Sequence, residues 1–177
     1  MSRLALLFAG FFLALTSTTA IAGETAGDHV DDPLTTARVK MALLDSSLSD
    51  ASDINVETSK GIVQLSGFLG SKDAKISAGQ VAAGVEDVKD VSNRITVRTS
   101  KRSIGKTLDD TILASKVKLA LAEEESTDAN RINVEVREGV VELSGFVGSY
   151  ADRNTAVEFV SQMDGVKDVI NSLDVTQ

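Results

Sequence analysis

The chain of 177 residues contains no cysteine, no tryptophan, one proline and one histidine. The absence of cysteine excludes disulfides, thiol catalysis, cysteine zinc sites and a lipid attached through an N-terminal cysteine. His29 has no second histidine or cysteine to complete a metal site, so neither a metal nor a cofactor is expected. Positive charge is also in deficit, because 18 Lys and Arg against 26 Asp and Glu give a net charge of −8. This balance argues against binding nucleic acid.

The long apolar run at the N-terminus extends from Leu4 to Leu15, after a short positive start and before small residues ending in Ala20-Ile21-Ala22. This order is typical of a signal peptide cleaved after Ala22. The run is shorter than the ~20 residues that a membrane-spanning helix needs, although an N-terminal anchor is the alternative. We expect a signal peptide over residues 1–22, a flexible leader over 23–30 and a soluble protein in the periplasm.

The remaining chain is one unit written twice, without gaps, at an offset of about 78 residues. The repeated motifs are Val39-Lys40-x-Ala42-Leu43 with Val117-Lys118-x-Ala120-Leu121, Ile54-Asn55-Val56-Glu57 with Ile132-Asn133-Val134-Glu135, Gly61-x-Val63-x-Leu65-Ser66-Gly67-Phe68 with Gly139-x-Val141-x-Leu143-Ser144-Gly145-Phe146, and Val88-Lys89-Asp90-Val91 with Val166-Lys167-Asp168-Val169. This predicts two copies of one domain, over residues 31–98 and 107–177, joined by a linker over 99–106.

Each copy reads as helix, strand, strand, helix, strand. Lys60-Gly61 and Glu138-Gly139 separate the first two strands, where a tight hairpin needs positive φ. Ser71 and Ser149 are expected to cap the second helix. A strand, helix and strand in succession favour a right-handed parallel crossover. The predicted fold class is therefore α+β: two tandem αββαβ domains, each a three-stranded mixed sheet with two helices packed on one face.

The first helix of each copy is expected to begin at a capping residue and to bury an apolar stripe. Asp32 before Pro33 is a common start of a helix, and Thr107-x-x-Asp110 has the spacing of a capping box. The expected apolar residues are Leu34, Ala37, Met41 and Leu44 in copy one and Ile112, Val117, Leu119 and Leu121 in copy two.

The repeated motifs resemble the BON domain, a module of the bacterial envelope, over nearly all of the chain after the signal peptide. The resemblance implies a soluble envelope protein of the osmotic-stress type that is not an enzyme. A relative in the same family, an outer-membrane lipoprotein, binds anionic phospholipid. This chain lacks that relative's lipid-accepting cysteine, so the resemblance does not imply membrane anchoring.

The segment from Gly67 to Lys72 looks superficially like a phosphate-binding loop. Its spacing is shorter than in G-x-x-x-x-G-K-[ST], and Tyr150 replaces the lysine in copy two, so no nucleotide is expected. The repeated glycines are instead expected to be structural: Gly61, Gly67, Gly139 and Gly145.

No catalytic residue is expected, because no nucleophile with an adjacent base is visible. Glu57 and Glu135 fall on the predicted solvent side of their strands. Asp90 and Asp168 precede a strand, where aspartate commonly shapes turns.

Several side chains are candidates for contacts with a lipid or a partner. The cations are Arg98, Lys101, Arg102 and Lys106 around the linker and Lys116 and Lys118 on the first helix of copy two. Glu123-Glu124-Glu125 follows that helix and opposes anionic lipid. Phe68, Phe146 and Tyr150 could present their rings to a partner chain, although core packing is the favoured interpretation for the two phenylalanines.

Two functions from different classes remain open. In the first, the protein contacts envelope proteins or unfolded clients through sheet faces and edges, with chaperone-like activity. In the alternative, it binds anionic phospholipid peripherally through Lys116, Lys118 and the linker cations. The negative charge and the missing anchor favour the first.

Overall fold

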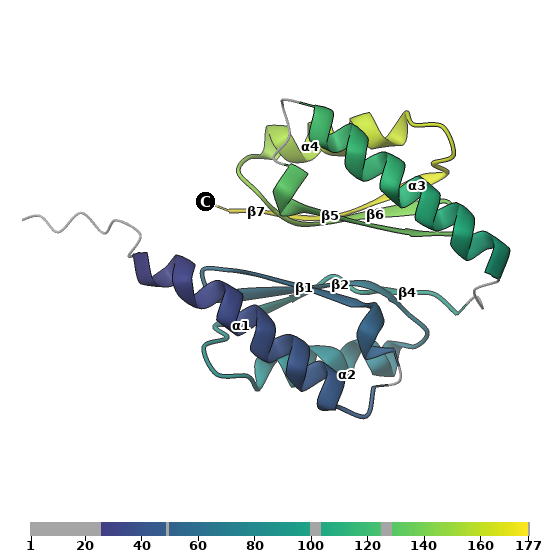
Figure 1. Cartoon of the computed structure of the whole chain (residues 1–177). Helices are drawn as coiled ribbons and strands as arrows, with labels where there is room; N and C mark the ends of the chain where they lie inside the picture. The colour runs from purple at the N-terminus through teal and green to yellow at the C-terminus, as the bar shows by residue number, and fades with distance from the viewer. Residues whose placement is uncertain (1–25, 49, 100–103, 125–128, 177) are drawn as a thin grey trace, which may run out of the picture.

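The computed structural model describes residues 26–48, 50–99, 104–124 and 129–176; the predicted signal peptide lies outside the described residues. Two sheets lie face to face at the centre, and two helices cover the outer face of each sheet (Figure 1). The predicted fold class is confirmed, because each half has two helices on one face of a small mixed sheet.

The first domain forms a sheet in the order β1-β2-β3, with β4 also paired to β2. Strands β1 and β2 are antiparallel, and β3 and β4 run parallel to β2. The sequence predicted one last strand, which the structure divides into β3 and β4. The elements are α1 (Ala26–Asp45), β1 (Ile54–Ser59), β2 (Ile62–Leu69), α2 (Lys72–Ala83), β3 (Asp90–Asn93) and β4 (Thr96–Val97).

The second domain repeats this topology with an unbroken last strand. Its sheet has the order β5-β6-β7, with β5 antiparallel and β7 parallel to β6. The elements are α3 (Ile104–Glu123), β5 (Ile132–Arg137), β6 (Val140–Val147), α4 (Tyr150–Ser161) and β7 (Asp168–Val175). Each domain has its own apolar core between its helices and the sheet face that these helices cover.

The first helix of each domain begins earlier than predicted. Helix α1 starts at Ala26 and α3 at Ile104, so each takes in the end of a stretch expected to be leader or linker. Pro33 lies inside α1. The predicted N-cap at Asp32 and the predicted capping box from Thr107 to Asp110 are therefore wrong, because these residues lie inside the helices.

Asp32 and Asp110 instead fasten the hairpin of their own domain. The two carboxylate oxygens of Asp32 accept hydrogen bonds from Lys60 N at 2.7 Å and Gly61 N at 2.9 Å. Asp110 accepts equivalent bonds from the backbone N–H groups of Glu138 and Gly139, at 2.8 and 3.0 Å. Since charge-assisted bonds to buried amides are stronger than neutral ones, each aspartate fixes the turn against the first helix.

The hairpin turns and the starts of the second helices agree with the prediction from the sequence. Gly61 and Gly139 have φ of +80° and +81°, as the tight hairpin requires. The side chains of Ser71 and Ser149 accept hydrogen bonds from the N–H groups of Ala74 and Asp152, which confirms both predicted N-caps.

Candidate interaction surfaces

The faces of the two sheets that carry no helices pack against each other. The hydroxyl groups of Ser66 and Ser144, 78 positions apart in the chain, lie 2.8 Å apart at the centre of this interface. Gly145 N donates to Gln64 Oε1 at 2.6 Å, and Gly67 N donates to Glu142 Oε2 at 2.9 Å. Because equivalent residues of the two copies exchange equivalent bonds, an approximate two-fold axis relates the domains.

A second pair of reciprocal bonds joins β1 to β5. Asn55 Nδ2 donates to Glu135 Oε2 at 3.0 Å, and Asn133 Nδ2 donates to Glu57 Oε1 at 2.8 Å. Both glutamates are half-buried, so the prediction that they are solvated is wrong. The sheet faces are covered by each other, which removes them as the partner surface that the sequence suggested.

The pKa values of two carboxyl groups in this interface are shifted in opposite directions. Burial raises the pKa of Glu142, although hydrogen bonds from Ser172, Gly67 N and Thr96 oppose the change. Burial acts in the same direction on Asp174, but hydrogen bonds from Gln64, Ser92 and Arg94 outweigh it and lower the pKa. Buried polar groups of this kind fix one relative placement of the domains when all of them are satisfied.

Phe68 and Phe146 also lie in the interface and are buried. They point to the opposite side of the sheet from Leu65 and Leu143, which belong to the apolar cores. Tyr150 is 58% exposed, and the Arg153 guanidinium lies over its ring at 4.9 Å. Of the three aromatic candidates, Tyr150 alone presents most of its surface to solvent.

The first helices expose the side chains that the sequence placed in the core. Val39 and Leu43 of α1 are fully buried, whereas Leu34, Met41 and Leu44 are 51%, 64% and 63% exposed. Ala37 is exposed as well. The predicted inward stripe of α1 is therefore wrong, since it lies on the outer face of the helix.

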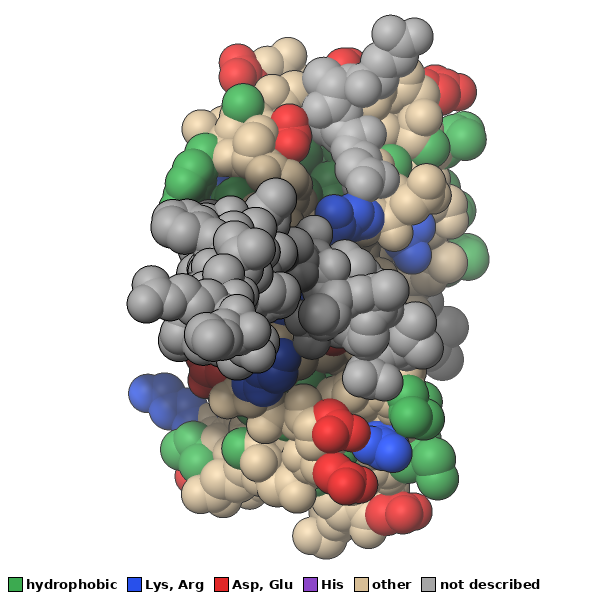
Figure 2. Space-filling view, turned by 90° about the vertical axis from the view of Figure 1, so that its left-hand side faces the viewer, with side chains coloured by type: hydrophobic (Ala, Val, Ile, Leu, Met, Phe, Trp, Pro, Cys, Tyr) green, Lys and Arg blue, Asp and Glu red, His purple; other side chains and the backbone are tan. Residues whose placement is uncertain are grey.

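Helix α3 carries the equivalent outer stripe. Val117 and Leu121 are buried as predicted, but Ile112 and Leu119 are 49% and 64% exposed. Leu108, at 63%, is a third exposed aliphatic side chain on this helix. Both α1 and α3 lie toward the viewer in Figure 1. Hydrophobic side chains accordingly gather along the right-hand margin of both domains in Figure 2.

The predicted cationic contacts do not form one cluster. Lys116 and Lys118 are exposed on α3 and, at 100° per residue, flank its apolar stripe on opposite sides. Arg98 is half-buried, with its guanidinium carbon 5.8 Å from the centroid of the Phe68 ring. Lys101 and Arg102 lie outside the described residues, as does the side chain of Lys106.

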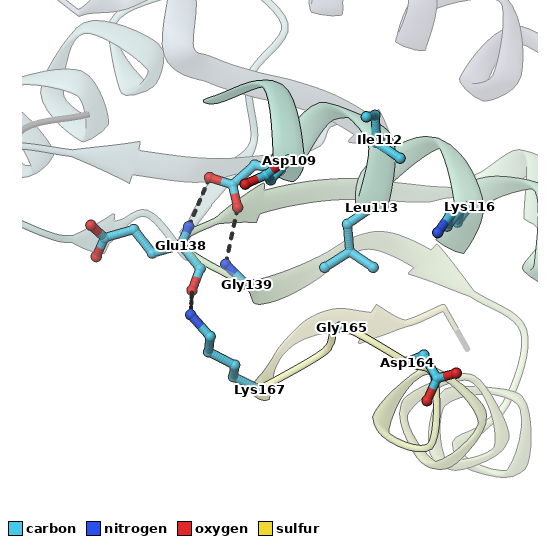
Figure 3. A pocket seen from close by; sticks show the side chains of 10 residues that line it. Asp109, Ile112, Leu113, Lys116, Glu138, Gly139, Asp164, Gly165 and Lys167 are labelled. Atoms are coloured by element: carbon cyan, nitrogen blue, oxygen red, sulfur yellow. Dashed lines mark hydrogen bonds between the residues drawn. The ribbon is translucent and has the colours of Figure 1, made fainter. Parts of the chain in front are cut away.

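A pocket of about 360 Å³ lies between α3 and the segment before β7 (Figure 3). Leu113 points from α3 toward Gly165, and Lys116 and Asp164 line the same pocket. The equivalent place in the first domain holds an ion pair between Arg38 and Asp87, with Glu86 at 3.7 Å. Because Lys116 and Gly165 replace Arg38 and Asp87, the second domain keeps this place open.

Within the part of the chain that the structure describes, no group of three or more His, Asp or Glu side chains is placed to hold a metal ion. Over the same residues, no helix combines the length and apolar character needed to cross a membrane.

The model of the family described as "BON domain" matches the chain twice, over residues 31–99 and 109–177. The chain therefore belongs to the BON domain family, and both domains of the structure are BON domains.

Among individual proteins, the chain is 38% identical over 148 residues to osmotically-inducible protein Y of Escherichia coli (strain K12), covering 83% of this chain and 74% of that protein. It is 30% identical over 148 residues to the outer membrane lipoprotein DolP of Haemophilus influenzae, covering 83% and 76%. Among solved structures, the chain matches the C-terminal domain of CdsD, a structural protein of the type III secretion system of Chlamydia trachomatis. The match covers 82% of this chain and 67% of that chain. Its TM-score of 0.33 and identity of 14% are too low to indicate a common placement of domains.

Proposed function

We propose that this chain is a non-enzymatic, exported protein of the bacterial envelope that responds to osmotic stress and binds other polypeptides, including unfolded segments. The similarity to osmotically-inducible protein Y supports the stress assignment, and the signal peptide predicted over residues 1–22 supports export to the periplasm. The binding surface is the outer apolar face of α1 and α3, defined by Leu34, Met41, Ile112 and Leu119.

The single observation that carries this proposal is the repetition of the exposed stripe. Leu34 matches Ile112, and Met41 matches Leu119, at the same place on the first helix of each domain. An exposed apolar patch is costly in a soluble protein and commonly marks an interaction site. Extended or unfolded segments, which expose their own apolar side chains, fit such a surface because burial of apolar area drives the contact.

A paired substitution tests this surface. The double variant Met41→Gln/Leu119→Gln should suppress aggregation of an unfolded client several-fold less well than the parent, because each stripe loses one of its most exposed apolar side chains. Light scattering of the client during refolding measures the effect. Ile76→Gln is the matched control, since Ile76 is 57% exposed on α2, outside both stripes. Equal suppression by all three proteins would contradict the proposal, as would a parent without suppression.

Binding of anionic phospholipid is the second candidate, favoured by Lys116 and Lys118 on either side of the α3 stripe. Each cation close to an anionic bilayer contributes about 1 kcal/mol. Flotation with anionic vesicles should be salt-sensitive and should fall markedly in Lys116→Glu. Lys40→Glu on α1, also at an exposed lysine, should float like the parent. Flotation that is the same with neutral vesicles, or absent altogether, would exclude this candidate.

A further inference from the structure

A second pocket, of about 640 Å³, opens between the two domains, away from the apolar stripes of α1 and α3. Ser59 and Asp90 line it from the first domain, and Phe146, Tyr150 and Thr176 line it from the second. Pockets at domain interfaces are common ligand sites. The approximate two-fold axis gives an internal comparison for this one, because it relates the pocket to an equivalent corner around Phe68.

The corner around Phe68 is filled by two arginines of the protein itself. The guanidinium carbons of Arg98 and Arg137 lie 5.8 and 6.0 Å from the centroid of the Phe68 ring. Arg137 is 9% exposed, and its Nη1 lies 3.5 Å from the carbonyl oxygen of Phe68. Phe68 is consequently 1% exposed.

At the pocket, the positions equivalent to the two arginines carry much smaller residues. Phe146 corresponds to Phe68 in the repeat, Ser59 corresponds to Arg137, and Thr176 corresponds to Arg98. Both small residues line the pocket, and Phe146 retains 7% exposure. The pocket is thus the space that two arginine side chains occupy at the other corner.

We propose that this pocket receives an arginine side chain of a partner polypeptide, with its guanidinium over the ring of Phe146. The corner around Phe68 shows that this fold accommodates a guanidinium in that position. The net charge of −8 draws basic segments to the protein, and Asp90 supplies a carboxylate at the pocket.

The pocket is also lined by the cations Lys60, Arg94 and Arg153, and the partners of the two arginines limit their repulsion of an incoming guanidinium. Arg94 is paired with Asp174, at 2.6 Å between Nη2 and Oδ1, and Arg153 lies over the ring of Tyr150. Two guanidinium groups beside one ring also have a precedent in this protein, at Phe68.

The probes are two short acetylated and amidated peptides that differ only in arginine or its uncharged isostere citrulline. Calorimetry gives the affinity. Tyr150 is the single tyrosine in a chain without tryptophan, so its fluorescence reports directly on the wall of the pocket. The arginine peptide should bind about tenfold more tightly than the citrulline peptide and should change the emission of Tyr150. Equal affinities, or no binding, would overturn the proposal.

Filling the pocket from within provides the decisive variant. Ser59→Arg should place a guanidinium over Phe146, as Arg137 does over Phe68, and should weaken the arginine peptide at least tenfold while raising the melting temperature. Gln80→Arg, at an exposed position of α2, makes the same charge change and should bind like the parent. Peptide binding retained by Ser59→Arg would overturn the proposal.

Two further measurements test the role of the aromatic ring and the nature of the ligand. Phe146→Leu keeps apolar bulk but removes the ring, so it should bind the arginine peptide about tenfold more weakly; it decides the question if Ser59→Arg does not fold. Free arginine should bind more weakly than the peptide. Equal binding of free arginine would assign the pocket to a small guanidinium compound and overturn the polypeptide partner.

Discussion

Replacing Gly145 by alanine should remove about 3 kcal/mol or more from the stability of the second domain. A Cβ atom at this position would lie 2.1 Å from the carbonyl oxygen of Arg131, a distance that real Cβ atoms do not tolerate. The φ of Gly145 is +115°, a region that residues with a side chain rarely adopt. Since domains of this size have a free energy of unfolding of roughly 4–10 kcal/mol, the variant should lose a large part of it.

The same change should weaken the contact between the domains. Gly145 N donates to Gln64 Oε1 at 2.6 Å, and its carbonyl accepts from Gln64 Nε2 at 3.2 Å. A backbone shift that relieves the clash therefore also disturbs the buried amide. Urea unfolding followed by circular dichroism would measure the loss.

Gly148→Ala is the matched control for Gly145→Ala. A Cβ atom at Gly148 would approach no heavy atom closer than Asp152 Oδ2 at 3.5 Å, so its effect should be small. Gly67→Ala is the equivalent change in the first domain, where Asp53 O would lie at 2.3 Å. If Gly145→Ala and Gly148→Ala unfolded at the same urea concentration, the close approach would have no energetic importance.

The topology could be predicted because its signals are local and occur twice. Lys60-Gly61 and Glu138-Gly139 mark a hairpin whose turn needs positive φ, and Ser71 and Ser149 mark the start of a helix after a strand. Agreement between two copies in one register also removes ambiguity that a single copy would leave.

The inward face of the first helix could not be predicted because α1 is apolar on two sides. Val39 and Leu43 pack inward, while Leu34 and Met41 point outward with spacing that is equally helical. The buried side also contains the polar residue Asp32, whose partners are amides of a hairpin nearly 30 residues later. Periodicity counts apolar residues and does not register a carboxylate that is buried because two N–H groups satisfy it.

The interface between the domains was missed for a related reason. Gln64 and Ser66 occupy the polar side of β2, which in a single domain indicates a solvated sheet face. The available signal was that the same side is polar in both copies, with Ser66 and Ser144 identical and Gln64 matched by the acid Glu142. These polar side chains are buried because the same sheet face of the other domain covers them.

Exchanging the side chains at this pair of positions should have very unequal effects. Gln64→Glu should cost about 3 kcal/mol near neutral pH, because a carboxylate would replace an amide group whose two N–H groups now face three acceptors. Gln64 Nε2 lies 3.2 Å from Gly145 O, 3.0 Å from Ser172 O and 2.8 Å from Asp174 Oδ2. A carboxylate there would face three acceptors, one of them charged.

Glu142→Gln, the reciprocal control, should be as stable as the parent or more stable near neutral pH. It removes a carboxylate that is 1% exposed. Gln64 shows that a glutamine at the equivalent position accepts the glycine N–H and finds acceptors for its amide group. The stabilisation from Glu142 itself is present below its unfolded pKa, ordinarily 4.5, and is lost as the pH rises through its raised folded pKa.

The pH dependence distinguishes electrostatic repulsion from a packing defect in Gln64→Glu. Repulsion raises the folded pKa of the new carboxyl, so the deficit of the variant relative to the parent should be largest near neutral pH and should shrink as the pH falls. Asp174 acts in the opposite sense in the parent: its lowered pKa contributes stability above its unfolded value of 3.8, which is lost on acidification. Unfolding should therefore be measured as variant minus parent at each pH. A deficit that is independent of pH would show that shape, and not charge, makes the two positions unequal.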